Sequence, residues 1–235
     1  MADPIAWPVK QREIYAVHDS SRWNDFQFRD DDVVIATPPK TGTTLTQQIV
    51  AQLIFRGDPD LFGRACSPWI DAAQMPNARE MAEAQTHRRF FKTHLPIDAL
   101  VYSPQAKYIF IGRDMRDIAW ALYNNVSNMS SFGRDQVVNS GTKFSDTIPD
   151  IIIYYRLFIN NSPFWSEIAD WWEYRHLPNL MMIHFSNLIS DLSGIIIKIA
   201  KFLNIALHDE LLEKVIKYSS LDHMKDLAAR DADLE

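Results

Sequence analysis

The stretch Val33-Val34-Ile35-Ala36-Thr37-Pro38-Pro39-Lys40-Thr41-Gly42-Thr43-Thr44 decides the fold. It opens with a continuous run of apolar and β-branched residues, which is typical of a buried parallel strand. The two prolines and Gly42 then form a sharp turn, and from Thr43 onward Leu45, Ile49 and Leu53 recur at helical spacing. A strand that turns directly into a helix predicts one unit of an α/β fold.

The turn between this strand and this helix also predicts an anion site. A helix start supplies free N–H groups and the positive end of the helix dipole. Gly42 permits close approach of the backbone, Thr43 and Thr44 add hydroxyl groups, and Lys40 adds a charge, so the turn suits a phosphate. It is not a Walker A loop, because Lys40 precedes the only glycine. The alternative is an ordinary turn with a capping threonine.

Patterns along the rest of the chain alternate between strand and helix. Further strands are predicted at 89–93, 108–112 and 180–185, and helices at 43–56, 77–87, 115–129, 150–161, 164–176, 194–204, 208–218 and 220–229. Residues 1–31 are predicted to be irregular and 130–149 to be a polar loop. The alternation predicts an α/β fold: a three-layer sandwich with a central parallel sheet flanked by helices. We expect one domain over residues 1–235.

In such sheets, ligands bind beyond the carboxyl ends of the strands, which selects residues 37–44, 92–96 and 113–117. His94 is a candidate general base, because an ordinary imidazole titrates near neutral pH. The alternative is a hydrogen-bonded structural histidine. The guanidinium of Arg113 can donate two hydrogen bonds to a second phosphate. Alternatively, residues 113–117 form a cluster of ion pairs on the surface.

Composition excludes several classes of protein. The chain has 24 Lys and Arg against 30 Asp and Glu, a net charge of −6, which is unsuited to coating nucleic acid. Residues 88–117 nevertheless carry six Lys or Arg and three Asp, which favours one small polyanion as ligand. The single cysteine, Cys66, excludes a disulfide framework and a Cys-rich zinc site, and the seven histidines show no metal-ligand spacing.

The location of the protein is predicted from what the sequence lacks. Residues 1–5 show no signal peptide, and no apolar stretch reaches the roughly 18–20 residues of a membrane span. We therefore expect a cytoplasmic protein.

Three segments together resemble the cytosolic-type sulfotransferases that use 3′-phosphoadenylyl sulfate (PAPS). The family motif T-Y-P-K-S-G-T-T-W is similar to residues 37–45, and K-T-H-L-P matches residues 92–96 fully. The third motif, R-[ND]-P-[KR]-D-V-x-x-S, is similar to residues 113–121. The resemblance runs from about residue 33 to 226 and implies a P-loop-NTPase-like version of the sandwich.

The resemblance implies transfer of a sulfuryl group from PAPS to a hydroxyl or amine of a small, aromatic or apolar acceptor, without a metal. His94 would take the acceptor's proton, Lys40 would contact the oxygen that bridges phosphate and sulfuryl, and Lys92 would neutralise the sulfuryl oxygens. Arg113 would hold the 3′-phosphate. The implied cofactor-binding residues are Lys40, Thr41, Gly42, Thr43, Thr44, Leu45, Arg113, Phe185 and Ser219. The aromatic residues expected to line an acceptor pocket are Trp7, Trp23, Phe62, Trp69, Phe90 and Tyr123.

The chain also departs from the family pattern. Leu45 replaces a tryptophan at adenine, Ala121 replaces a serine at the 3′-phosphate, and Phe185 replaces a tyrosine. A late glycine-containing segment that closes over the 3′-phosphate has no counterpart before Glu235. These departures favour an alternative, a degenerate non-catalytic scaffold that binds PAPS or its product adenosine 3′,5′-bisphosphate (PAP). Retention of the lysines and histidine argues against it, and the absent Walker A order disfavours a kinase.

Overall fold

The computed structural model describes residues 5–15, 17–129 and 150–232. Within these ranges four parallel strands form one sheet in the order β2-β1-β3-β4. The strands are β1 (Val33–Ala36), β2 (Phe90–Thr93), β3 (Lys107–Gly112) and β4 (Leu180–His184). Each predicted strand is present to within one residue at either end, because the sheet is buried on both faces and its strands are continuous apolar runs.

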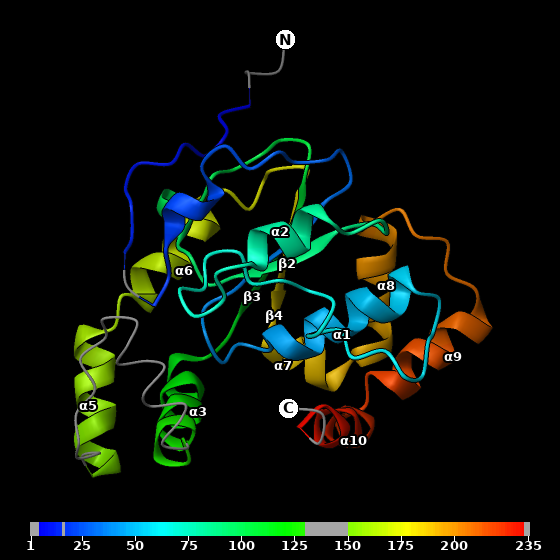
Figure 1. Ribbon diagram of the computed structural model, residues 1–235. Helices are drawn as coiled ribbons and strands as arrows, with labels where there is room; N and C mark the ends of the chain where they lie inside the picture. Colours follow the sequence, from blue (N-terminus) through cyan, green and yellow to red (C-terminus); the bar gives the residue numbers. More distant parts are fainter. Residues whose placement is uncertain (1–4, 16, 130–149, 233–235) are drawn as a thin grey trace.

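Helices cover both faces of this sheet (Figure 1). They are α1 (Thr43–Ile54), α2 (Ala78–Glu83), α3 (Met115–Ser127), α5 (Ile151–Asn161), α6 (Phe164–Glu173), α7 (Phe185–Ser190), α8 (Leu192–Phe202), α9 (Asp209–Tyr218) and α10 (Leu221–Ala232), with short 3-10 turns at Ser20–Trp23 and Ile97–Ala99. The parallel α/β sandwich is therefore confirmed. Sequence patterns missed α7, whose first residue, Phe185, was included in the strand predicted at 180–185. The loop predicted at 130–149 lies outside the described residues.

Alternate residues of the strands point to opposite faces of the sheet and belong to two separate hydrophobic cores. Ile35 and Ile109 point toward α1, α8 and α9, whereas Tyr108 and Phe110 pack against Trp171 of α6. Figure 1 shows α8 and α9 on one side of the sheet and α6 on the other. Trp23 and Phe90, predicted to line an acceptor pocket, are fully buried members of these cores. That prediction was wrong for both, because aromatic content alone does not distinguish a core from a pocket.

Half of the predicted basic cluster lies at the amino ends of the strands. Arg89 forks onto the buried carboxylate of Asp32, Nε to Oδ1 at 2.8 Å, just before β1. Arg88 and Lys107 donate to backbone carbonyls at the end of α8. A strand of four to six residues separates its two ends by roughly 13–20 Å. These three cations therefore belong to the fold, and the prediction that the whole cluster faces one ligand was wrong.

Candidate active site

A cavity of about 560 Å³ opens at the carboxyl ends of β1, β2 and β3. It lies beside β1, from which the chain continues to β2 at one edge of the sheet, and β3, from which it continues to β4 at the other edge; such a reversal of strand order is where α/β sheets bind ligands. Nine of the predicted site residues line it: Lys40, Gly42, Thr43, Thr44, Leu45, Lys92, His94, Arg113 and Phe185. The other two do not line it, since Thr41 is buried within the turn and Ser219 is buried at the end of α9.

The turn after β1 is held in shape by its own hydroxyl groups. The Thr41 hydroxyl donates to the carbonyl of Pro38 at 2.8 Å, and the hydroxyls of Thr37 and Thr43 lie 2.6 Å apart. Gly42 precedes α1 with a φ of 111°, and a Cβ there would lie 2.9 Å from Phe185 Cδ2. Only glycine fits this position, and no side chain caps the N–H groups that begin α1. The turn therefore forms a cradle with backbone donors.

Arg113 connects this cradle to the end of β3. It donates to the carbonyl of Lys40 at 2.8 Å, and its guanidinium carbon lies 4.2 Å from the centre of the Phe185 ring. Its Nε is buried without a hydrogen bond, and the nearest carboxylate, that of Asp117, is 3.8 Å away. A held guanidinium with an unused donor suits a second anionic group.

His94 is positioned as a base. Its Nδ1 lies 2.6 Å from the carbonyl oxygen of Thr37. Because a carbonyl only accepts, Nδ1 carries the hydrogen and Nε2 keeps its lone pair. Burial, followed by the charge of Lys92, lowers the pKa of His94 to about 3. The imidazole is therefore neutral at physiological pH and free to accept a proton.

Two lysines share the cavity with His94. Burial, with the charges of Arg64 and Lys40, lowers the pKa of Lys92 to about 8, and its Nζ lies 4.0 Å from the centre of the Trp69 ring. Burial also lowers the pKa of Lys40, whose Nζ donates to Asn125 Oδ1 at 2.5 Å. Burial disfavours the charged form of both lysines, and an anion that binds beside them would favour that form again.

Sequence reasoning missed two polar residues of the cavity, Asn125 and His18. Asn125 follows Ala121 by one helical turn of α3, so the spacing of the third motif offered a signal for it. His18 lies in the irregular segment before β1, where no pattern pointed to it. It reaches the cavity because its backbone pairs with that of Ala72.

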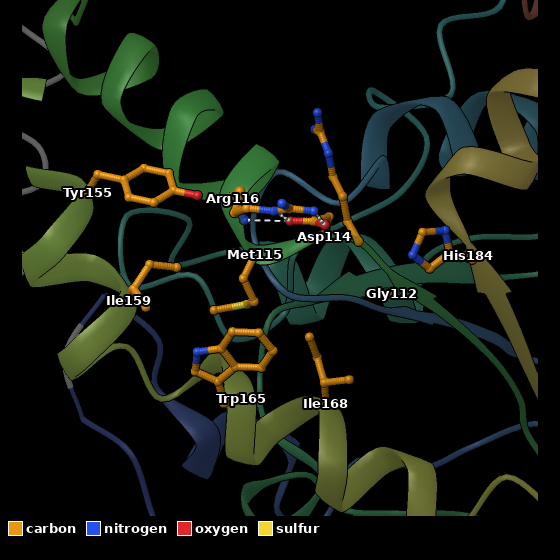
Figure 2. A pocket seen from close by; sticks show the side chains of 10 residues that line it. Gly112, Asp114, Met115, Arg116, Tyr155, Ile159, Trp165, Ile168 and His184 are labelled. Atoms are coloured by element: carbon orange, nitrogen blue, oxygen red, sulfur yellow. Dashed lines mark hydrogen bonds and ion pairs between the residues drawn. The ribbon is translucent and has the colours of Figure 1, made fainter. Parts of the chain in front are cut away.

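A second, more apolar cavity of about 620 Å³ lies beside the first, at the ends of β3 and β4. Figure 2 shows Tyr155 and Ile159 of α5, and Trp165 and Ile168 of α6, around it. Exposed Arg116 lines this cavity and pairs with Asp114 at 2.6 Å. His94 follows β2, three strand spacings from β4, or about 14 Å. The first cavity is therefore the candidate active site.

The described residues contain neither a helix suited to a membrane nor a cluster suited to a metal ion. No helix in the described ranges is long and apolar enough to cross a membrane. The same part of the chain contains no group of three or more His, Cys, Asp or Glu side chains arranged to hold a metal ion.

Comparisons with known proteins identify the family of the chain. The model of the sulfotransferase domain family matches residues 30–234. A glycolipid sulfotransferase of Mycobacterium tuberculosis is 31% identical over 263 residues, covering 96% of this chain and 79% of the relative. A 3-beta-hydroxysteroid sulfotransferase of Cavia porcellus is 28% identical, covering 86% and 68%.

Solved structures share the fold. A mouse sulfotransferase complexed with PAP superposes with a TM-score of 0.67 at 21% identity, covering 87% of this chain and 69% of that one. Retinol dehydratase in complex with retinol and PAP gives a TM-score of 0.71 at 18% identity, covering 89% and 70%. The family match over residues 30–234 and the 31% identity to the glycolipid sulfotransferase place the chain in the sulfotransferase domain family.

Proposed function

We propose that the protein transfers a sulfuryl group from PAPS to a hydroxyl group of a small, largely apolar acceptor. The observation that carries the proposal is the convergence of two lysines, Arg113 and a neutral His94 in one cavity. The names of the similar proteins support the acceptor class, because glycolipids and hydroxysteroids both join an apolar part to hydroxyl groups. Trp69 supplies an aromatic wall beside His94, with ring centroids 5.0 Å apart.

The residues of the cavity fit the nucleotide. The cradle at Gly42 would hold the 5′-phosphate with the first N–H groups of α1 and the hydroxyls of Thr43 and Thr44. Arg113, with its unused Nε donor, would hold the 3′-phosphate. When bound, PAPS supplies a sulfuryl group already attached to a phosphate leaving group. Leu45 and Phe185 offer apolar surface for adenine.

The remaining side chains suit an in-line displacement. His94 Nε2 takes the proton of the attacking hydroxyl, for which it must be neutral. Lys92 offsets negative charge on the sulfuryl oxygens, and Lys40 offsets the charge that grows on the departing oxygen. Both lysines are half-buried, where a charge interacts more strongly than in water.

Calorimetry and product analysis test the proposal. We expect PAP to bind more tightly than ATP, and PAPS to yield a sulfated product with a phenol, a hydroxysteroid or a glycolipid. His94→Ala should keep the PAP Kd within about twofold while losing about 10²–10⁴ in rate. Arg116→Ala is the matched control, because exposed Arg116 lies in the second cavity and should leave both quantities unchanged.

The same measurements distinguish the alternative function. The replacements at Leu45 and Ala121 favour a non-catalytic scaffold, which would bind PAP and release no sulfated product with any acceptor. Absence of PAP binding would reject both readings. Activity that survives His94→Ala would reject the base assigned above.

A further inference from the structure

A short ladder of backbone hydrogen bonds lies beside the edge strand β2. The N–H of Lys92 donates to the carbonyl of Pro68 at 3.0 Å, which places residues 68–73 beside this strand. On the far side of that segment, the N–H of Asp19 donates to the carbonyl of Asp71 at 2.7 Å, and His18 pairs with Ala72. Because of this pairing, His18 of the irregular segment lies in the cavity wall, next to the end of β2.

The ladder also buries a carboxylate behind the cavity. Asp71 is fully buried and accepts from the indole N–H groups of Trp23 at 3.0 Å and Trp69 at 2.9 Å. Burial opposes its ionisation, but interactions with His18, Trp23 and Thr93 outweigh burial and hold the pKa of Asp71 below its usual value. A negative charge therefore lies directly behind the residues that face the acceptor.

His18 lies between this carboxylate and His94. Its Nδ1 is 3.3 Å from Asp71 Oδ2, within ion-pair distance but outside hydrogen-bond geometry, and it makes no hydrogen bond in the described ranges. A hydrogen on Nδ1 would face this carboxylate, which only accepts, and would leave the lone pair of the neutral ring on Nε2. The rings of His18 and His94 meet edge-on, with centroids 5.9 Å apart, and both side chains line the cavity.

We propose that His18, oriented by Asp71, receives from His94 the proton that the acceptor loses. The inference rests on the proposed function. In the reaction the acceptor's O–H bond breaks and its oxygen forms a bond to sulfur, while the bond from sulfur to the phosphate oxygen breaks and its electron pair leaves with PAP. The proton passes to His94 Nε2 and then through a bridging water to His18 Nε2. His94 is thereby neutral again.

The charges around the two rings determine where the proton rests. His94 faces the cation Lys92, its Nδ1 contacts the carbonyl of Thr37, and the opposing influence of the Asp71 charge is the smallest of these effects. His18 has the carboxylate of Asp71 behind it and the acidic side chain of Glu167 from α6 in its vicinity. Both rings also adjoin Trp69, which carries no charge. A positive charge is therefore opposed at His94, whereas on His18 it would lie beside a carboxylate.

Substitution of His18 tests this transfer. His18→Ala should lower kcat by at least tenfold, leave the PAP Kd within twofold, and recover rate when free imidazole is added. Asp71→Asn should also lower kcat, and the double variant should be no slower than the slower single variant, because the two residues act as a unit. Exposed His176 gives the matched control, since His176→Gln should change neither quantity.

Unchanged kcat in His18→Ala would overturn the inference, as would a loss of kcat that imidazole does not restore. A readout that is independent of turnover separates this inference from the proposed function. Histidine NMR spectra of the PAP complex should show the ring hydrogen of neutral His18 on Nδ1, next to Asp71, and Asp71→Asn should abolish that preference. A ring hydrogen on Nε2 in the wild type would refute the inference. Wild-type protein that binds PAP but transfers no sulfuryl group would refute only the proposed function.

Discussion

Gly42→Ala should damage both the fold and nucleotide binding. Gly42 has a φ of 111°, a conformation that costs an L-residue about 1–2 kcal/mol. For a chain of this length that corresponds to a fall in Tm of roughly 2–8 °C. The new Cβ would also lie 2.9 Å from the Phe185 ring, on which the Arg113 guanidinium rests. Displacing that ring moves Arg113, so we expect PAP affinity to fall at least about tenfold, equivalent to about 1.4 kcal/mol.

Calorimetric unfolding and PAP titration measure the two effects separately. Gly112→Ala is the matched control, because its Cβ would meet only Phe110, at 3.8 Å, and its φ is not in the left-handed region. We expect this control to change the PAP Kd by less than twofold. Wild-type PAP affinity in Gly42→Ala would refute the assignment of the turn after β1 to the 5′-phosphate. Equal losses in both variants would refute the steric argument.

Three further predictions follow from the same geometry. Ala121→Ser should tighten PAP binding at least several-fold, because it adds a hydrogen bond to a charged group, and should leave the affinity for adenosine 5′-phosphosulfate unchanged. Equal tightening of both ligands in calorimetry would contradict the 3′-phosphate site. Asp32→Asn leaves the buried charge of Arg89 unpaired and should lower Tm by roughly 6–20 °C. Replacing both residues with apolar ones should recover most of the loss. A Tm within about 2 °C of wild type for Asp32→Asn would contradict the cost assigned to the unpaired charge. PAP affinity should fall above about pH 8, up to tenfold per pH unit, as Lys92 loses its proton, and Lys92→Arg should remove that dependence in titrations from pH 7 to 10. In the unfolded chain the pKa of Lys92 is about 10.4, against about 8 in the folded protein. Between about pH 8 and about pH 10.4 the unfolded state therefore binds more protons, and the contribution of Lys92 to the free energy of unfolding should rise with pH.

The sequence by itself determined the order of the elements and the place of the site. Apolar runs and helical periods are local properties, so the strands at 33–36 and 107–112 and the helix that follows Gly42 could be located without a structure. The convergence of Lys40, His94 and Arg113 was equally predictable. Parallel strands place their carboxyl ends along one edge of the sheet, so any three such segments become neighbours.

Only the tertiary structure decided which charged groups face the ligand. Arg88 and Arg89 are close to Lys92 in sequence, yet β2 carries them to its opposite end. His18 is far from His94 in sequence, yet backbone pairing places their rings in contact. The pKa of His94 likewise depends on burial and on the charge of Lys92, neither of which a motif records. Pairing between distant segments and the exclusion of water arise only when the whole chain packs, so no local pattern can encode them.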